Sequence, residues 1–130
     1  MGVPSIVNCI DNTGVVRVKI IKVFGHSNKR QAKIGDRVSI VISLLNLNTK
    51  NMKDLRKRHR FRRGSIHKGV VVQTKQRFLR WNKTWIKFTK NAIVLVDKKN
   101  IPFGKKIKGI IPVEVANRYP KVASIASRIV

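Results

Sequence analysis

The stretch VVRVKIIKVF, which spans Val15–Phe24, decides the fold class of this chain. Its apolar residues alternate with Arg17 and Lys19 at a period of two, which is the spacing of a β-strand with one buried face. The alternation slips by one position at Ile20 and Ile21, as a β-bulge would produce. The stretch is therefore predicted to be a bulged strand that turns one face to a core and its basic side chains outward.

Similar patterns recur along the chain, with turn residues between them. Arg37–Leu45 has an apolar residue at every second position from Val38 to Leu44, which predicts a second strand with one buried face. Gly69–Val72 and Asn91–Asp97 are continuously apolar at their centres, which favours strands buried on both faces. Further strands are expected at Ile6–Ile10 and Lys106–Ile111, and turns at Asp11–Gly14 and Lys98–Asn100.

The segment Gln73–Phe88 is predicted to form a β-hairpin that turns near Asn82 and Lys83. Pro112 suits the first position of a helix. Short helices are expected at Val113–Asn117 and Lys121–Ser127. Several short strands with helices only at the end indicate an all-β chain that forms a small barrel.

The chain shows no internal repeat and no linker that would divide it. Residues 1–130 are therefore expected to form one domain. Within it, residues 46–67 are interpreted as a basic inserted loop and residues 112–130 as a C-terminal helical segment.

The charge of the chain points to a polyanionic partner. Thirty Lys or Arg residues against five Asp or Glu give a formal net charge of +25, while the hydrophobic content of 42% is ordinary for a folded protein. Such a charge destabilises the compact state unless a polyanion neutralises it. Nucleic acid is favoured over an anionic membrane or an acidic protein, because the charge is spread along the whole chain as well as clustered. No apolar run has the length of a membrane span, and no signal or transit segment is apparent.

Catalytic and metal sites find little support in the sequence. Cys9 is the only cysteine, which excludes an intramolecular disulfide, and its apolar neighbours predict a buried thiol. The five acids are widely spaced, no phosphate-cradling glycine loop occurs, and the three histidines lack metal-ligand spacing. We therefore expect neither enzymatic activity nor a cofactor.

Candidate RNA-binding residues lie in basic loops and on strand faces. The densest cluster is KDLRKRHRFRRG, residues 53–64, where seven of twelve positions are Lys or Arg. Arginine binds phosphate through a planar fork, and exposed aromatic rings can stack on unpaired bases. For Trp81 and Trp85, core packing and base stacking are both open. The candidates are Asn12, Arg17, Lys19, Lys29, Arg30, Lys33, Lys53, Arg56, Lys57, Arg58, Arg60, Arg62, Arg63, Lys75, Arg77 and Arg80.

The sequence resembles the family of universal large-subunit ribosomal protein fourteen over most of its length. Ile10–Gly25 resembles the family's opening turn and basic strand, and His26–Val38 its Arg-rich loop. The most specific similarity is a set of residues at fixed spacing. Gly69–Val72 is followed after nine residues by Asn82-Lys83 and after four more by Phe88. Asn91 then follows after two residues, and Val94-Leu95 after another two.

The chain departs from the family pattern at three places. Lys83 stands where the family has glycine, and the basic connection at residues 46–67 is longer and richer in arginine. Near the C-terminus, Gly104-Lys105-Lys106-Ile107 replaces the family's Gly-Thr-Arg-Ile, and Val113 and Ala116 replace the arginines that flank its Glu-Leu.

The resemblance implies a closed five-stranded barrel with an extended hairpin, small C-terminal helices and a role in translation. The implied partners are large-subunit rRNA, large-subunit proteins three and nineteen, small-subunit rRNA across a bridge and a ribosome-silencing factor. The expected interface residues are Lys105, Lys106, Arg118 and Lys121. The runner-up function is a free barrel-type (OB-like) RNA-binding factor or RNA chaperone. The abundance of Ile, Lys and Asn, which have AT-rich codons, favours a mitochondrial ribosome over a plastid or bacterial one.

Overall fold

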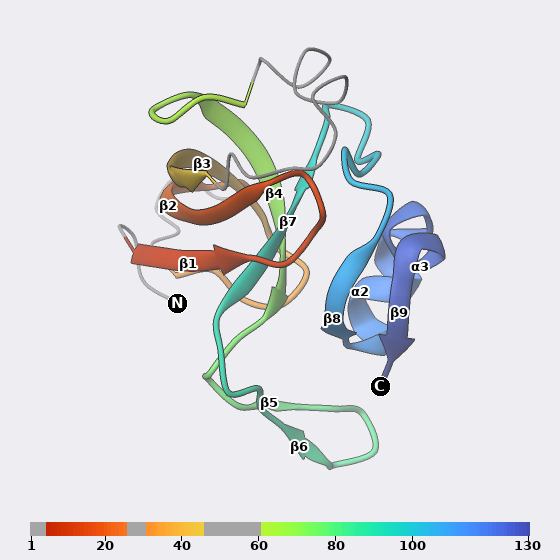
Figure 1. Cartoon of the computed structure of the whole chain (residues 1–130). Helices are drawn as coiled ribbons and strands as arrows, with labels where there is room; N and C mark the ends of the chain where they lie inside the picture. Colours follow the sequence, from red (N-terminus) through yellow and green to blue (C-terminus); the bar gives the residue numbers. More distant parts are fainter. Residues whose placement is uncertain (1–4, 26–30, 46–60) are drawn as a thin grey trace.

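The computed structural model describes residues 5–25, 31–45 and 61–130, and these residues form a closed β-barrel with an arm and a C-terminal layer (Figure 1). Antiparallel pairs join neighbouring strands around the barrel, and a parallel pair between the first and last strands closes it. The predicted all-β class and the five-stranded closure are confirmed. The barrel strands, in spatial order, are β1 (Ser5–Cys9), β2 (Val15–Val23), β3 (Arg37–Leu45), β4 (Ile66–Gln73) and β7 (Ala92–Val96).

The barrel interior is filled by the apolar residues that the period of two places on the inner face. Val18 and Ile20 of β2 and Ile40 of β3 are fully buried, whereas Arg17 and Lys19 are exposed. The pairing of β2 with β3 shifts register between Ile20 and Lys22, which confirms the predicted bulge.

The expectation for Leu44 is wrong. Its side chain is exposed, and the next residue, Leu45, packs against the barrel core. The register between β2 and β3 shifts again between Val15 and Arg17, so the strict alternation ends at this end of the pair. A one-residue shift reverses the face to which a side chain points, and a bulge on the partner strand causes such a shift.

The two continuously apolar strands are buried on both faces, as predicted. On β4, Val71 belongs to the inner core, whereas Val70 and Val72 belong to a second cluster outside the barrel. Strand β7 shows the same division, with every residue of Ala92–Val96 buried. The outer faces of both strands are covered by β8 (Ile107–Ile111), α2 (Val113–Arg118) and α3 (Pro120–Ile125).

The C-terminal segment is helical only in part. The helix predicted to continue to Ser127 ends at Ile125, and the chain then forms β9 (Ala126–Ile129). Strand β9 pairs in parallel with β8, with Ala126 opposite Ile107. The edge of β8 offers these residues backbone partners from a distant part of the chain, and this tertiary pairing outweighs local helix propensity. No helix in the described ranges is long and apolar enough to cross a membrane.

The predicted hairpin forms an arm, defined here as residues 75–90, that extends away from the barrel (Figure 1). It contains β5 (Phe78–Leu79) and β6 (Trp85–Ile86). Its turn is closed by a backbone hydrogen bond from Lys83 N to Arg80 O at 2.9 Å. Lys83, which stands where the resembled family has glycine, itself takes the left-handed conformation, with φ of 64°. A three-residue hairpin loop requires that conformation at its third position, where glycine is the usual residue.

Candidate nucleic-acid interface

The acids in the described part of the chain are occupied by intramolecular contacts. Asp11 is buried, and its carboxylate accepts hydrogen bonds from Thr13 Oγ1 at 2.6 Å and from the backbone N of Leu95 at 3.1 Å. Asp36 accepts a bond from the backbone N of Lys33, and Asp97 accepts two from its own turn. Glu114 forms an ion pair with Arg80. These carboxylates shape the fold and leave most of the surface cations uncompensated.

Burial of Cys9 confirms the prediction of a buried thiol. Its Sγ donates a hydrogen bond to Asp11 Oδ1 at 3.1 Å. Burial, together with the negative charge of Asp11, raises the pKa of the Cys9 thiol well above its ordinary value. Among the described residues, no group of three or more His, Cys, Asp or Glu side chains could hold a metal ion.

Most of the described candidate cations are exposed, and they lie at separate places on the molecule. Arg17 and Lys19 project from the outer face of β2, and Arg62 and Arg63 from the segment before β4. The remaining exposed candidates are Lys33, before β3, and Lys75 and Arg77 on the arm. Lys29, Arg30, Lys53, Arg56, Lys57, Arg58 and Arg60 lie outside the described residues.

The basic cluster at residues 53–64, called the basic run below, is anchored to the barrel by an aromatic side chain. Phe61 is only 7% exposed and belongs to the barrel core, so the run contributes apolar surface as well as charge. Its ring lies edge-on to Phe103 with centroids 5.2 Å apart and meets His67 at 4.9 Å. Backbone hydrogen bonds join Gly64 and Ser65 to Ile42 of β3. The barrel therefore fixes the C-terminal end of the run, which carries Arg62 and Arg63.

Three further cations, which the sequence reading did not single out, converge on one aromatic ring. The Nζ atoms of Lys22 and Lys68 lie 5.7 and 5.5 Å from the centre of the Phe24 ring, and Arg37 Cζ lies 5.7 Å from it. Within the described ranges no carboxylate forms an ion pair with these cations, and Arg37 Nε is buried without a hydrogen-bond partner. We call Lys22, Arg37, Lys68 and Phe24 the Phe24 cluster.

The Phe24 cluster could not be found from sequence alone. Lys22, Arg37 and Lys68 come from β2, β3 and β4, and Phe24 follows β2 directly. The antiparallel pairing of these three neighbouring strands brings the residues together. Like charges gathered around one side chain repel each other, and a bound anion would offset that repulsion. The cluster therefore gathers positive charge of the kind that attracts an oxyanion.

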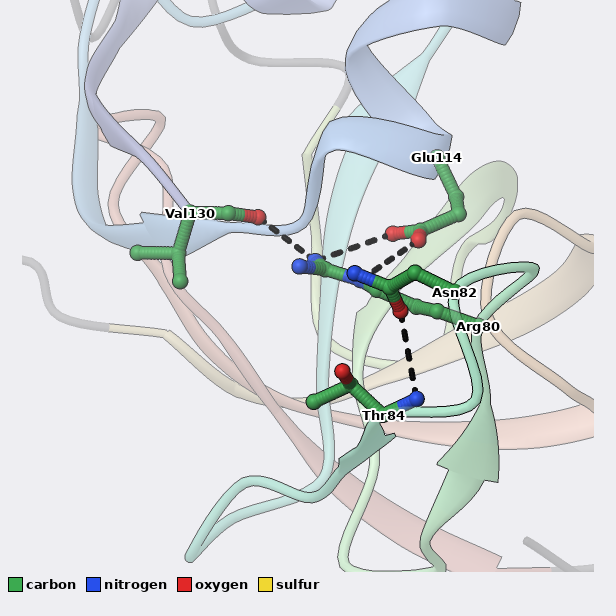
Figure 2. A network of polar contacts seen from close by, with 5 residues as sticks. All are labelled: Arg80, Asn82, Thr84, Glu114 and Val130. Carbon is green, nitrogen blue, oxygen red and sulfur yellow. Dashed lines mark hydrogen bonds and ion pairs between the residues drawn. The ribbon is translucent and has the colours of Figure 1, made fainter.

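Arg80 differs from the other described RNA-binding candidates because its guanidinium is bonded within the chain and anchors the arm. Figure 2 shows its guanidinium directed toward α2 and the C-terminal strand. Its Nε lies 2.7 Å from Glu114 Oε1, and its Nη2 donates to Glu114 Oε2 at 3.2 Å and to the backbone oxygen of Val130 at 2.6 Å. At the turn beside it, Asn82 Oδ1 accepts a bond from Thr84 N at 3.1 Å. The arm is therefore fastened to the C-terminal layer.

The arm presents its two tryptophans to solvent. Trp81, at the turn, is 95% exposed and Trp85 is 54% exposed, so neither is a core residue. The guanidinium of Arg77 lies over the Trp85 ring, 4.6 Å from its centre. Of the two interpretations left open, core packing is excluded for both side chains.

Asn12 has a structural role. Its Oδ1 accepts hydrogen bonds from the backbone N atoms of Lys105 at 2.8 Å and Lys106 at 3.3 Å. A Cβ atom at Gly104 would lie 2.7 Å from this oxygen, so only glycine fits there without displacing Asn12. The contact holds the segment so that the side chains of Lys105 and Lys106 are exposed, as predicted.

The other two predicted interface residues lie on the C-terminal helices. Arg118 and Lys121 are exposed, and both line a cavity of about 250 Å³ together with Lys99 and Tyr119. The Arg118 guanidinium lies 5.7 Å from the centre of the Tyr119 ring. Lys105 and Lys106 do not line this cavity, so the four residues form two basic sites.

Comparison with known proteins agrees with this architecture. The family described as ribosomal protein L14p/L23e matches residues 1–130. The large ribosomal subunit protein uL14 of Methanoregula boonei (strain DSM 21154 / JCM 14090 / 6A8) is 38% identical over 126 residues, which cover 94% of this chain and 86% of that protein. Both similarities extend over the barrel, the arm and the C-terminal layer.

Proposed function

The chain belongs to the ribosomal protein L14p/L23e family and is a structural constituent of the large ribosomal subunit, and from this premise we propose that its exposed cations bind large-subunit rRNA. The Phe24 cluster is the observation that carries the proposal. Three cations lie around one ring without an ion-paired carboxylate in the described ranges, and a phosphate bound beside them would offset their charge. Phosphate contacts of this kind supply affinity and fix register, and they need no base sequence.

The test is the salt dependence of RNA binding by the purified protein. Each phosphate contact contributes a slope of roughly −0.7 to −0.9 to the plot of log affinity against log salt. Lys22→Gln with Lys68→Gln should reduce the magnitude of the slope by about 1.5, because two phosphate contacts are lost. The matched control removes two exposed lysines outside the basic sites described above, Lys98→Gln with Lys108→Gln. Equal reductions in both double variants would show that only total charge matters and would contradict a phosphate site at Phe24.

Incorporation into the subunit tests the basic run. Arg58, Arg60, Arg62 and Arg63 replaced together by Ser should leave the circular dichroism of the barrel intact, because Phe61 and its core contacts remain. The variant should enter large subunits poorly and leave them at a lower salt concentration than the wild-type protein. Sedimentation of salt-washed subunits measures both effects. Loss of the β signal would show that the arginines are needed for folding.

We further propose that the exposed lysines after Gly104 serve the intersubunit face. Asn12 fixes the backbone at Lys105 and Lys106, so their ammonium groups project from a rigid turn toward an acidic partner or small-subunit rRNA. Arg118 and Lys121 form a second basic site on the same C-terminal layer. The family resemblance supports a bridge and a silencing factor here, with large-subunit proteins three and nineteen as neighbours.

Charge reversal separates this role from rRNA anchoring. Large subunits that carry Lys105→Glu and Lys106→Glu should assemble normally, yet join small subunits poorly or fail to bind the silencing factor. Sucrose-gradient profiles of reassociated subunits measure the effect. If the reversed protein fails to enter large subunits, these lysines belong to the rRNA anchor.

For the compartment, we propose a mitochondrial ribosome. The support is the abundance of residues with AT-rich codons and the enlarged basic connection at residues 46–67. The relative reported above is archaeal, and plastid and bacterial ribosomes are the alternatives. Immunodetection of the chain across ribosomes from separated compartments tests the proposal, and a signal confined to cytosolic ribosomes would refute it.

A further inference from the structure

A cavity of about 270 Å³ lies at the root of the arm, where the arm meets the segment before β3. Its apolar wall is formed by Phe78, Leu79 and Trp85 of the arm strands. Lys33 from the segment before β3 and Arg77 of the arm also line it. An aromatic wall and two cations therefore line the same cavity.

The aromatic wall is open to a ligand. Trp85 is 54% exposed although the Arg77 guanidinium already lies over its ring, and Leu79 is 53% exposed. An arginine over an indole forms a layered planar surface, on which a further planar group can stack. Gln76, also in the lining, has an exposed amide that offers both a donor and an acceptor.

The walls of the cavity are held in place before any ligand binds. The Thr74 hydroxyl donates to the backbone oxygen of Gln76 at 2.9 Å, and Lys75 N donates to Asn91 Oδ1 at 2.8 Å. Farther along the arm, Arg80 is bonded to Glu114, as Figure 2 shows. A preorganised site loses less conformational entropy when its ligand binds.

We propose that this cavity receives one unpaired nucleotide of RNA, with its base stacked on Trp85 and its phosphates contacted by Lys33 and Arg77. The inference rests on the proposed rRNA binding and identifies a nucleotide site within it. A dry cavity of about 150 Å³ holds one benzene ring, so a cavity of about 270 Å³ has room for the fused rings of a purine. An apolar peptide side chain would fill the wall but leave both cations without a counter-charge, whereas a nucleotide supplies a base and an anion together.

The test compares two RNA duplexes that differ by a single extrahelical 2-aminopurine, a fluorescent purine. The wild-type protein should bind the bulged duplex roughly fivefold tighter or more, because stacking on an aromatic side chain contributes on that scale for each base. The fluorescence of the 2-aminopurine should fall on binding, since stacking against an indole quenches it. Trp85→Ala should remove both the preference and the quenching, while its affinity for the fully paired duplex stays unchanged.

Two variants keep the test independent of folding. Trp81→Ala removes the other exposed tryptophan of the same arm and should retain the preference in full. Trp85→Phe keeps an aromatic wall and should retain part of it. Circular dichroism of all three variants checks that the barrel is intact.

The same site can be probed in assembled subunits. Large subunits that carry Trp85→Ala should show one or a few unpaired rRNA bases newly reactive to a base-specific chemical probe, and subunits that carry Trp81→Ala should not show this change. Loss of a neighbouring protein without any newly reactive base would mean that a protein segment fills the cavity. That result would overturn the proposed nucleotide site.

Failure of the nucleotide site and failure of the proposed rRNA binding give different results in this test. Equal affinity for the two duplexes, without quenching, overturns the nucleotide site and leaves rRNA binding through phosphates intact. Failure to bind either duplex at low salt overturns the proposed function together with the site.

Discussion

The substitution Phe61→Ala tests whether the basic run is anchored to the barrel. A buried phenylalanine replaced by alanine costs about 3–5 kcal/mol of unfolding free energy. Phe61 is 7% exposed, but its ring neighbours Phe103 and His67 are only partly buried and can relax, so we expect the lower end, about 3 kcal/mol. A domain of this length has a stability of roughly 7–20 kcal/mol, so the variant should remain folded.

Urea unfolding followed by circular dichroism measures the loss, at a salt concentration that screens the self-repulsion of the charges. At a slope of about 1.5–2 kcal/mol per molar urea, the midpoint should fall by about 1.5–2 M. The double variant with Phe103→Ala should reveal a coupling of about 0.5–1.5 kcal/mol, because the two rings meet edge-on. Arg63→Ser is the matched control, since its exposed side chain should change stability by less than about 0.5 kcal/mol. A loss below about 1 kcal/mol for Phe61→Ala would refute the anchor.

Three further changes have defined outcomes. Lys83→Gly should stabilise the protein by about 0.5–1 kcal/mol in the same urea assay, because the left-handed conformation strains any residue with a Cβ atom; a loss of stability would contradict this reading of the turn. Gly104→Ala should lower the thermal midpoint by several degrees, since its Cβ would displace Asn12 Oδ1 from two backbone donors, and an unchanged midpoint would show that the turn shifts freely. The pKa of the Cys9 thiol is raised in the folded state. Ionisation of this thiol should therefore leave the free energy of unfolding unchanged below the ordinary pKa of a thiol and lower it as the pH rises above that value. The Cys9 thiol should react with a thiol reagent only on unfolding, and rapid reaction in the native state would show that it is accessible.

Much of the barrel follows from the sequence, because the period of two assigns each strand residue to a face. Val18 and Ile20 are buried and Arg17 is exposed for this local reason. The continuous apolar stretch of β7 predicted burial on both faces. One face packs in the barrel interior and the other against the C-terminal layer. The net charge and the crowding of basic residues likewise need no structure to be recognised.

Only the tertiary structure decided which charged side chains are paired within the chain and which gather on its surface. Arg80 read as one more RNA-binding arginine, but its partner Glu114 lies 34 residues farther along the chain. Lys22, Arg37 and Lys68 lie on three strands and meet at Phe24 because β2, β3 and β4 pair side by side in that register. The local sequence period determines the face on which a side chain lies. The residues that meet across strands are determined by register, bulges and closure, which depend on pairing between distant segments.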